Sequence, residues 1–108
     1  MKTVDLSSSI NTRSMLIDAE YSIACAKAEG IELVKFINGD GRGGVARRRA
    51  LRSHLRNSIR RGSVKQMLEG DKISAEDRLT RFFCNFHPEL SNDPDVESKN
   101  PNVTFVRV

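Results

Sequence analysis

The stretch from residue 38 to residue 61, NGDGRGGVARRRALRSHLRNSIRR, decides how this chain is organised. It places four glycines within six residues, directly after an apolar run that ends at Ile37. Glycine clusters of this kind are typical of a tight connection between two elements. Arginine-rich, helix-compatible sequence follows and contains no acidic residue. The stretch therefore predicts a strand that ends at Ile37, a glycine turn, and a basic helix from about Gly44 to Arg60 or Arg61.

The residues before this stretch predict a strand, a helix and a second strand. Residues 3–6 are β-capable, and Asn11 or Thr12 is suited to cap a helix that runs to Gly30. Residues 32–37 are too continuously apolar for a half-exposed strand, which favours a central, covered position. Strand, helix and strand in this order form a right-handed βαβ unit with parallel strands. We therefore expect the segments after the two strands to leave the sheet at the same edge.

The residues after the basic helix are less regular. Residues 64–69 are compatible with a short helical turn that Gly70 ends. The sequence RFFCNF at 81–86 is β-capable, and VTFVRV at 103–108 alternates as a strand does, so we expect the two to pair. Residues 87–102 are polar and contain three prolines, which predicts a long mobile loop.

Length and composition are typical of one intracellular domain. The 108 residues fit a single domain, 1–108, with one modest core. No export signal and no apolar run of about 20 residues is seen, so no membrane association is expected. The two cysteines are far apart in sequence and predict free thiols in a reducing compartment. We therefore expect a cytoplasmic protein, with its oligomeric state left open.

Charge is distributed unevenly along the chain. The formal net charge is +4, but residues 41–61 hold eight of the eighteen Lys and Arg and none of the fourteen acids. Such asymmetry favours a polyanionic partner. Within the predicted helix, arginines recur at spacings of 3, 4 and 4 and so share one side: Arg49, Arg52, Arg56 and Arg60. Their repulsion would be relieved by a bound anion or by acids from elsewhere in the fold.

The glycine turn is a candidate phosphate contact. It contains G-x-G-x-x-G, but the chain is too short for a dinucleotide-binding fold and has no acid about 20 residues further on. Glycines still let backbone N–H groups approach an anion, and a helix N-terminus adds partial positive charge. A positive φ in the turn would explain one or two glycines, whereas four followed by arginines favour phosphate binding. The candidate nucleic-acid-binding residues are Gly39, Gly41, Arg42, Gly43, Gly44, Arg47, Arg48, Arg49, Arg52 and Arg56.

The order of elements resembles the Smr (small MutS-related) domain family over nearly the whole chain. The family carries Leu-Asp-x-His at its first strand, where this chain has Val4-Asp5-Leu6-Ser7. It carries His-Gly-x-Gly after its second strand, where this chain has Asn38-Gly39-Asp40-Gly41. The closing strand, residues 103–108, also looks like that of the family. Residues 63–80 form an apparent insertion relative to the family.

The resemblance implies a two-layer α/β sandwich with the order βαβαββ. It has a mixed four-stranded sheet and two main helices, similar to the C-terminal domain of bacterial translation initiation factor three. It also implies binding to DNA or RNA and, in some members, nicking or RNA-cleaving endonuclease activity.

Both signature histidines are replaced here, by Ser7 and Asn38. Neither side chain can transfer a proton as histidine does, and such help is worth roughly 100- to 10,000-fold in rate. The first hypothesis is therefore a nucleic-acid-binding domain without efficient cleavage. If four or five phosphates are neutralised, log affinity should fall with log salt at a slope of about −4.

Two alternatives stay open. In one, Asp5, Asn38 and Asp40 hold a divalent metal such as Mg²⁺ that activates water, and the chain is a metal-assisted endonuclease. In the other, the basic face binds an acidic protein, and the chain is an interaction accessory.

Overall fold

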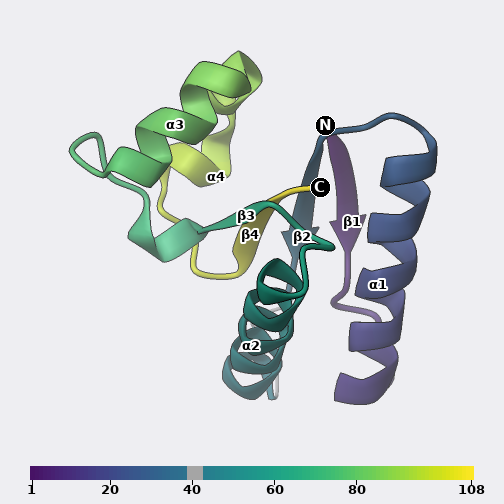
Figure 1. Cartoon of the computed structure of the whole chain (residues 1–108). Helices are drawn as coiled ribbons and strands as arrows, with labels where there is room; N and C mark the ends of the chain where they lie inside the picture. Colours follow the sequence, from purple (N-terminus) through teal and green to yellow (C-terminus); the bar gives the residue numbers. More distant parts are fainter. Residues whose placement is uncertain (39–42) are drawn as a thin grey trace.

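A four-stranded mixed sheet lies at the centre of the computed structural model, which describes residues 1–38 and 43–108 (Figure 1). The strands are β1 (Lys2–Asp5), β2 (Leu33–Ile37), β3 (Gln66–Glu69) and β4 (Val103–Arg107), in the order β1-β2-β4-β3. β1 runs parallel to β2, as predicted for a βαβ unit, and β4 is antiparallel to both β2 and β3. The predicted mixed four-stranded sheet is confirmed.

Two long helices cover one face of this sheet. α1 (Thr12–Ala28) begins where Asn11 accepts a hydrogen bond from the Ser14 backbone N–H, and α2 (Gly44–Arg60) follows β2. Their apolar stripes pack on the β2 and β4 side chains of that face, and fully buried Leu51 and Leu55 anchor α2. Both helices were predicted from their periodicity, and both are confirmed. None of the helices in the described ranges has the length and apolarity of a membrane span.

Shorter helices cover the other face and add a partial layer to the expected two. α3 (Arg78–Phe86) buries Phe83, and the 3-10 helix η2 (Pro88–Asn92) buries Leu90. Both side chains pack with Leu33 and Phe105 of the central strands. α3 and α4 (Pro94–Glu97) lie together at one end of the molecule, away from α1 (Figure 1). Because both faces of β2 are covered, its nearly continuous apolar sequence is explained.

The strand predicted at 81–86 is wrong, and so is the helical turn predicted at 64–69. Residues 81–86 belong to α3, whose N-cap Asp77 accepts hydrogen bonds from the Thr80 N–H at 2.9 Å and hydroxyl at 2.8 Å. Residues 66–69 form β3, which pairs with β4 in the place expected for 81–86. β3 stops at Gly70, where a Cβ would overlap the backbone carbonyl oxygen of Asn100. The segment 63–80, expected to be an insertion, thus supplies an edge strand of the sheet.

Residues 87–102, where the sequence predicted a long mobile loop, carry two short helices, η2 and α4. A buried ion pair fastens them to the sheet, because Lys35 Nζ lies 2.9 Å from Asp93 Oδ2 and 2.7 Å from Asp95 Oδ2. Burial disfavours the charge on Lys35, but the hydrogen bonds to Asp93 and Asp95 outweigh it and raise the pKa of Lys35. The charged side chain of Lys35, in the middle of β2, therefore holds residues 93–95 against the sheet.

We predict that Lys35→Met lowers the free energy of unfolding by about 3–5 kcal/mol, because it leaves neighbouring carboxylates without their buried partner. Lys2→Met is the matched control, since Lys2 pairs with Glu29 at 3.1 Å in a half-exposed setting. The control should cost no more than about 1 kcal/mol. Urea unfolding measures both, and equal losses would contradict the anchoring role of Lys35.

Candidate nucleic-acid interface

The parallel pairing of β1 and β2 brings Asp5 to the edge of the sheet where the glycine turn begins. Asp5 pairs in register with Ile37, and the Leu6 N–H donates to the Ile37 carbonyl oxygen at 2.8 Å. The Asp5 carboxylate is exposed and accepts from the Ser7 backbone N–H at 2.9 Å. Hydrogen bonds from the Ser7 side chain and backbone hold the pKa of Asp5 below its ordinary value. Asp5 is thus an ionised cap of the serine loop.

Asn38 points into the fold instead of toward Asp5. Its side chain is buried, and Nδ2 donates to Met15 Sδ at 3.2 Å. Its backbone N–H donates to the Asn102 carbonyl oxygen at 2.7 Å, which fixes the turn before β4. Asp40, the third member of the predicted metal site, lies outside the described residues. Among residues 1–38 and 43–108, no cluster of three His, Cys, Asp or Glu side chains could hold a metal ion.

The start of α2 forms an open hollow beside this turn. Gly43 is the N-cap residue, and its φ of 79° lies in the left-handed region, so glycine is required there. Within the described part of the chain, no side chain caps the first N–H groups of α2. The hollow has a volume of about 620 Å³ and is lined by Gly43, Gly44, Val45, Ala46, Arg48, Arg49, Pro101 and Asn102. Three candidates, Gly39, Gly41 and Arg42, lie outside the described residues.

Three of the predicted binding arginines have acidic or backbone carbonyl partners inside the fold: Arg47, Arg52 and the more exposed Arg56, which contacts Glu69. Arg47 donates to the backbone carbonyls of Ser9 at 2.7 Å and Ile10 at 3.1 Å, and so ties the loop before α1 to α2. Arg52 is 9% exposed and donates to Asp71 at 2.6 Å and to the Pro101 carbonyl at 3.1 Å. Burial opposes the charge of Asp71, but the contact with Arg52 outweighs it and lowers the pKa of Asp71. Arg47 and Arg52 therefore have structural roles.

Glu69 organises the middle of the helix. It is 5% exposed, accepts from Arg56 at 2.7 Å, and lies 2.8 Å from Lys72 and 3.8 Å from Arg52. A second hollow of about 220 Å³ opens above it, lined by Val45, Arg48, Arg49, Arg52, Arg56, Glu69 and Lys72. Three of these cations, Arg52, Arg56 and Lys72, contact the carboxylate, and the two hollows share Val45, Arg48 and Arg49. A groove lined by arginines therefore follows α2.

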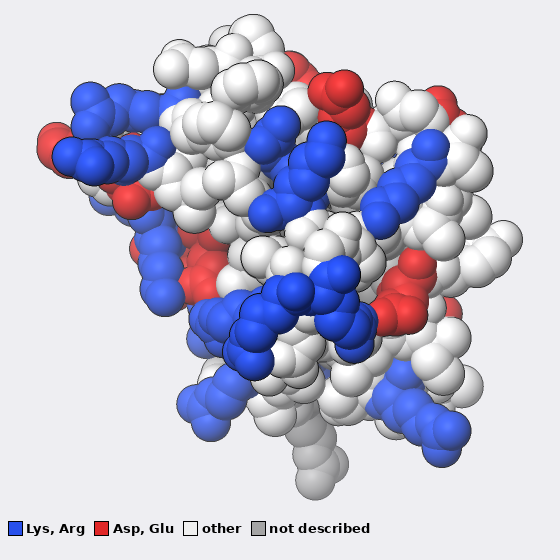
Figure 2. Space-filling view, viewed as in Figure 1, with Lys and Arg blue, Asp and Glu red and all other residues white. Residues whose placement is uncertain are grey.

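Of the remaining arginines of α2, Arg49 and Arg60 face solvent and Arg48 is half-buried. Arg49 and Arg60 are exposed and have no ion-pair or hydrogen-bond partner among the described residues, and Arg48 has only a 3.4 Å contact with Asn102. Figure 2 shows Lys and Arg side chains crossing the part of the surface that α2 occupies, with acidic side chains to either side. We call Arg48, Arg49, Arg56 and Arg60 the α2 basic face. Arg60 was not among the binding candidates, although its spacing from Arg56 signalled it.

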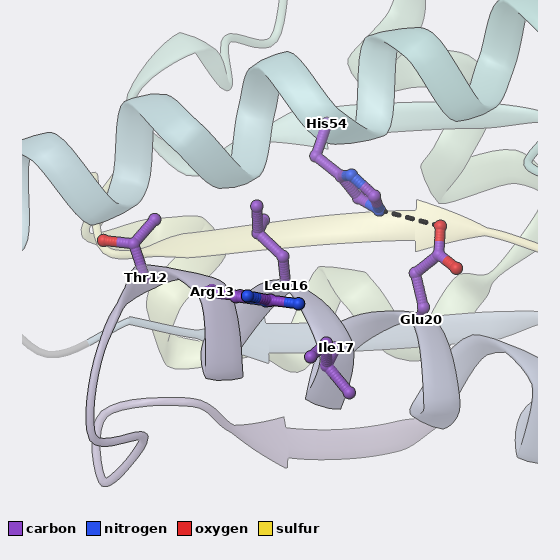
Figure 3. Close-up of a pocket in the computed structure, with 6 residues that line it drawn as sticks. All are labelled: Thr12, Arg13, Leu16, Ile17, Glu20 and His54. Atoms are coloured by element: carbon purple, nitrogen blue, oxygen red, sulfur yellow. Dashed lines mark ion pairs between the residues drawn. The ribbon is translucent and has the colours of Figure 1, made fainter.

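A further hollow, of about 550 Å³, lies between α1 and α2 (Figure 3). Leu16 and Ile17 line it together with His54, whose Nε2 lies 3.0 Å from Glu20 Oε1. Its cations are Arg13 and, on protonation, His54. This mixed lining lacks the concentration of arginines found along the α2 basic face.

Comparison with known proteins bears on the fold. No protein-family model and no curated protein sequence matches the chain. Among solved structures, the crystal structure of the Smr domain of Thermus thermophilus MutS2 is similar, with a TM-score of 0.61 and 20% sequence identity. The match covers 99% of this chain and 96% of that chain. This chain has the fold of an Smr domain. At this identity the Smr likeness establishes the architecture, and the roles of individual residues rest on their own geometry.

We predict that Arg52→Ala lowers the free energy of unfolding by about 3 kcal/mol, because it leaves the buried Glu69 and its neighbour Asp71 short of a cation. Arg49→Ala should change it by no more than about 0.5 kcal/mol, since that side chain has no partner among the described residues. Urea unfolding of the two variants tests whether Arg52 stabilises the fold while Arg49 does not. If Arg49→Ala lowered the free energy of unfolding as much as Arg52→Ala, this distinction between the two arginines would be wrong.

Proposed function

We propose that this chain is a nucleic-acid-binding Smr-like domain without efficient nuclease activity. The observation that carries the proposal is the α2 basic face beside the start of α2, which no side chain among residues 1–38 and 43–108 caps. Backbone N–H groups at a helix N-terminus are suited to a phosphate, and the helix dipole favours negative charge there. Arg48 and Arg49 line the same hollow and would neutralise that phosphate.

The groove that continues along α2 would take further phosphates of the same strand. From Gly44 to Arg56 the helix rises about 18 Å, which is long enough to follow several phosphates. Glu69 holds the guanidinium of Arg56 at 2.7 Å and so orients it before any ligand arrives. All these donors address the phosphate backbone, so DNA or RNA would be bound with little sequence preference.

The internal partners of Arg47 and Arg52 reduce the number of charges available to a ligand. We therefore expect about three neutralised phosphates, and a slope of log affinity against log salt of about −2.7 for duplex DNA. This is shallower than the value of about −4 that the sequence suggested, because the sequence did not separate the structural arginines from the exposed ones.

We predict that Arg49→Glu weakens binding to a fluorescently labelled duplex by roughly tenfold, which corresponds to about 1.4 kcal/mol, and makes the salt slope shallower by about 1 or more. Fluorescence anisotropy between about 50 and 200 mM salt measures both quantities. Arg78→Glu is the matched control, since Arg78 is an exposed arginine at the start of α3.

The control separates a local site from general charge. Arg78→Glu changes the net charge equally but should leave affinity within about twofold, because long-range effects are screened at these salt concentrations. Equal losses in both variants, or no binding by the wild type at low salt, would contradict the proposed site. An acidic protein partner would use the same arginines, and binding of such a protein without binding of nucleic acid would favour that alternative.

Weak cleavage is proposed from the chemistry of the residues at the sheet edge. Asn38, where the family resemblance implies a histidine, is buried against Met15 and cannot transfer a proton. Asp5 has a lowered pKa and is engaged by Ser7, so it is a poor general acid at neutral pH. A metal-assisted endonuclease would have to rely on Asp5 with Asp40.

We predict that the purified protein leaves supercoiled plasmid intact in Mg²⁺, because no residue with a suitable proton donor lies at this edge among those described. Agarose gels compare the wild type with Asp5→Ala. Nicking by the wild type that Asp5→Ala abolishes would replace the proposal with the endonuclease alternative. Equal nicking by both would indicate a contaminating nuclease.

A further inference from the structure

The side of α1 that faces away from the sheet carries an apolar stripe at heptad spacing. Ser14, Ile17, Tyr21, Ala24 and Ala28 follow one another at intervals of 3, 4, 3 and 4 residues. This alternation is that of the a and d positions of a coiled coil. We call these five residues the outer α1 seam. The buried residues of α1 lie on the opposite side of the helix: Met15, Ala19, Ile23 and Ala26.

The outer α1 seam is exposed in the described part of the chain. Ile17 is 59% exposed and Tyr21 is 72% exposed, and Ala24 and Ala28 are exposed as well. Figure 3 shows Leu16 pointing toward α2 and Ile17 pointing away from it. The seam thus presents two large apolar side chains, Ile17 and Tyr21, followed by the small side chains of Ala24 and Ala28, and adjacent exposed apolar residues on one helix face are suited to contact with another helix.

The charges beside the seam favour another α1 in parallel orientation. In the heptad frame, Arg13, Glu20 and Lys27 occupy g positions, and Asp18 and Cys25 occupy e positions. The counterpart of Lys27, residue 32, lies beyond the end of α1. A parallel pair places each g residue opposite the e residue five positions further on in the partner helix. Arg13 would then face Asp18 of a second copy, twice by symmetry, and Glu20 would face the uncharged Cys25.

The antiparallel arrangement is disfavoured by the same charges. Aligning the seam in that direction places g residues opposite g residues and e residues opposite e residues. Arg13 would then face Lys27, Glu20 would face another Glu20, and Asp18 another Asp18. Like charges in such positions are destabilising. Shifted by one heptad, the antiparallel alignment places Glu20 opposite Lys27, but both side chains are engaged within their own chain, Glu20 with His54 and Arg61, and Lys27 with the Ser63 carbonyl oxygen. The charges that are available, Arg13 and Asp18, therefore favour the parallel pairing.

We propose that the outer α1 seam pairs with the same seam of a second copy of this chain, forming a parallel homodimer. Arg13 is exposed without a partner among the described residues, and the Asp18 carboxylate accepts only from the Ser9 hydroxyl, at 2.8 Å. Both groups are therefore available for the ion pair across the dimer.

The alanines at 24 and 28 let the two helices approach closely. The seam is about 21 Å long, so the interface is smaller than a standard one and the dimer is weak and concentration-dependent. The proposal is independent of nucleic-acid binding.

Sedimentation equilibrium from about 10 µM to about 1 mM tests it. The expected mass rises from that of the 12.1 kDa chain toward twice that value. Ile17→Glu should remain monomeric throughout the range. Val45→Glu is the control, since Val45 is 58% exposed on α2, and it should dimerise as the wild type does. A wild type that stays monomeric at every concentration, or dimerisation by Ile17→Glu, would overturn the proposal.

A charge exchange tests the parallel register. Arg13→Glu and Asp18→Arg should each weaken the dimer several-fold, because each places like charges across the seam. The double variant Arg13→Glu plus Asp18→Arg should restore the wild-type dissociation constant. Circular dichroism confirms that all variants keep their helices. A double variant as weak as the single variants would overturn the assigned pairing.

Discussion

The carboxylate of Glu69 is buried at the end of edge strand β3, where an unpaired charge would be costly. Arg52 and Arg56 come from α2 to neutralise it, together with Lys72. These contacts and the burial of Leu51 and Leu55 against the sheet are satisfied by the same rotation of α2 about its own axis. The same rotation turns the α2 basic face outward. The buried acid thus holds Arg52 in the fold and contacts the exposed Arg56, while Arg49 and Arg60 have no partner among the described residues.

The turn before β4 lies beside the start of α2 and is held by contacts from two directions. The turn before β4 is held by the backbone of Asn38 on one side and by Arg52, through the Pro101 carbonyl, on the other. That turn and the left-handed Gly43 form the walls of the hollow in which Arg48 and Arg49 lie. Asn38 therefore contributes to the proposed binding surface as a structural residue. Its role is to position backbone, which is consistent with a surface that binds phosphate without cleaving it.

Local patterns predicted the first half of the fold, because caps, helical periodicity and the continuous apolar run of β2 are all encoded within a few residues. The second half depended on distant partners. The aromatic residues of 81–86 favoured a strand by composition, yet Leu79, Phe82 and Phe83 share one helical face that packs on the core, and Asp77 caps the helix. β3 is a strand because β4 offers it an edge. For the site, charge and glycine content indicated α2, but only the positions of Glu69 and Asp71 show that Arg52 is structural.

The central claim, that phosphate is bound along α2, is tested most directly by ¹⁵N-HSQC titration with a short nucleic-acid duplex. The account predicts that the largest chemical-shift changes fall on the backbone amides of residues 43–49 and 102 and on the side chains of Arg49 and Arg56, and that they diminish with added salt. α3 and the outer α1 seam should change little. Largest changes on α3 or along α1, or the absence of changes at the start of α2, would contradict it.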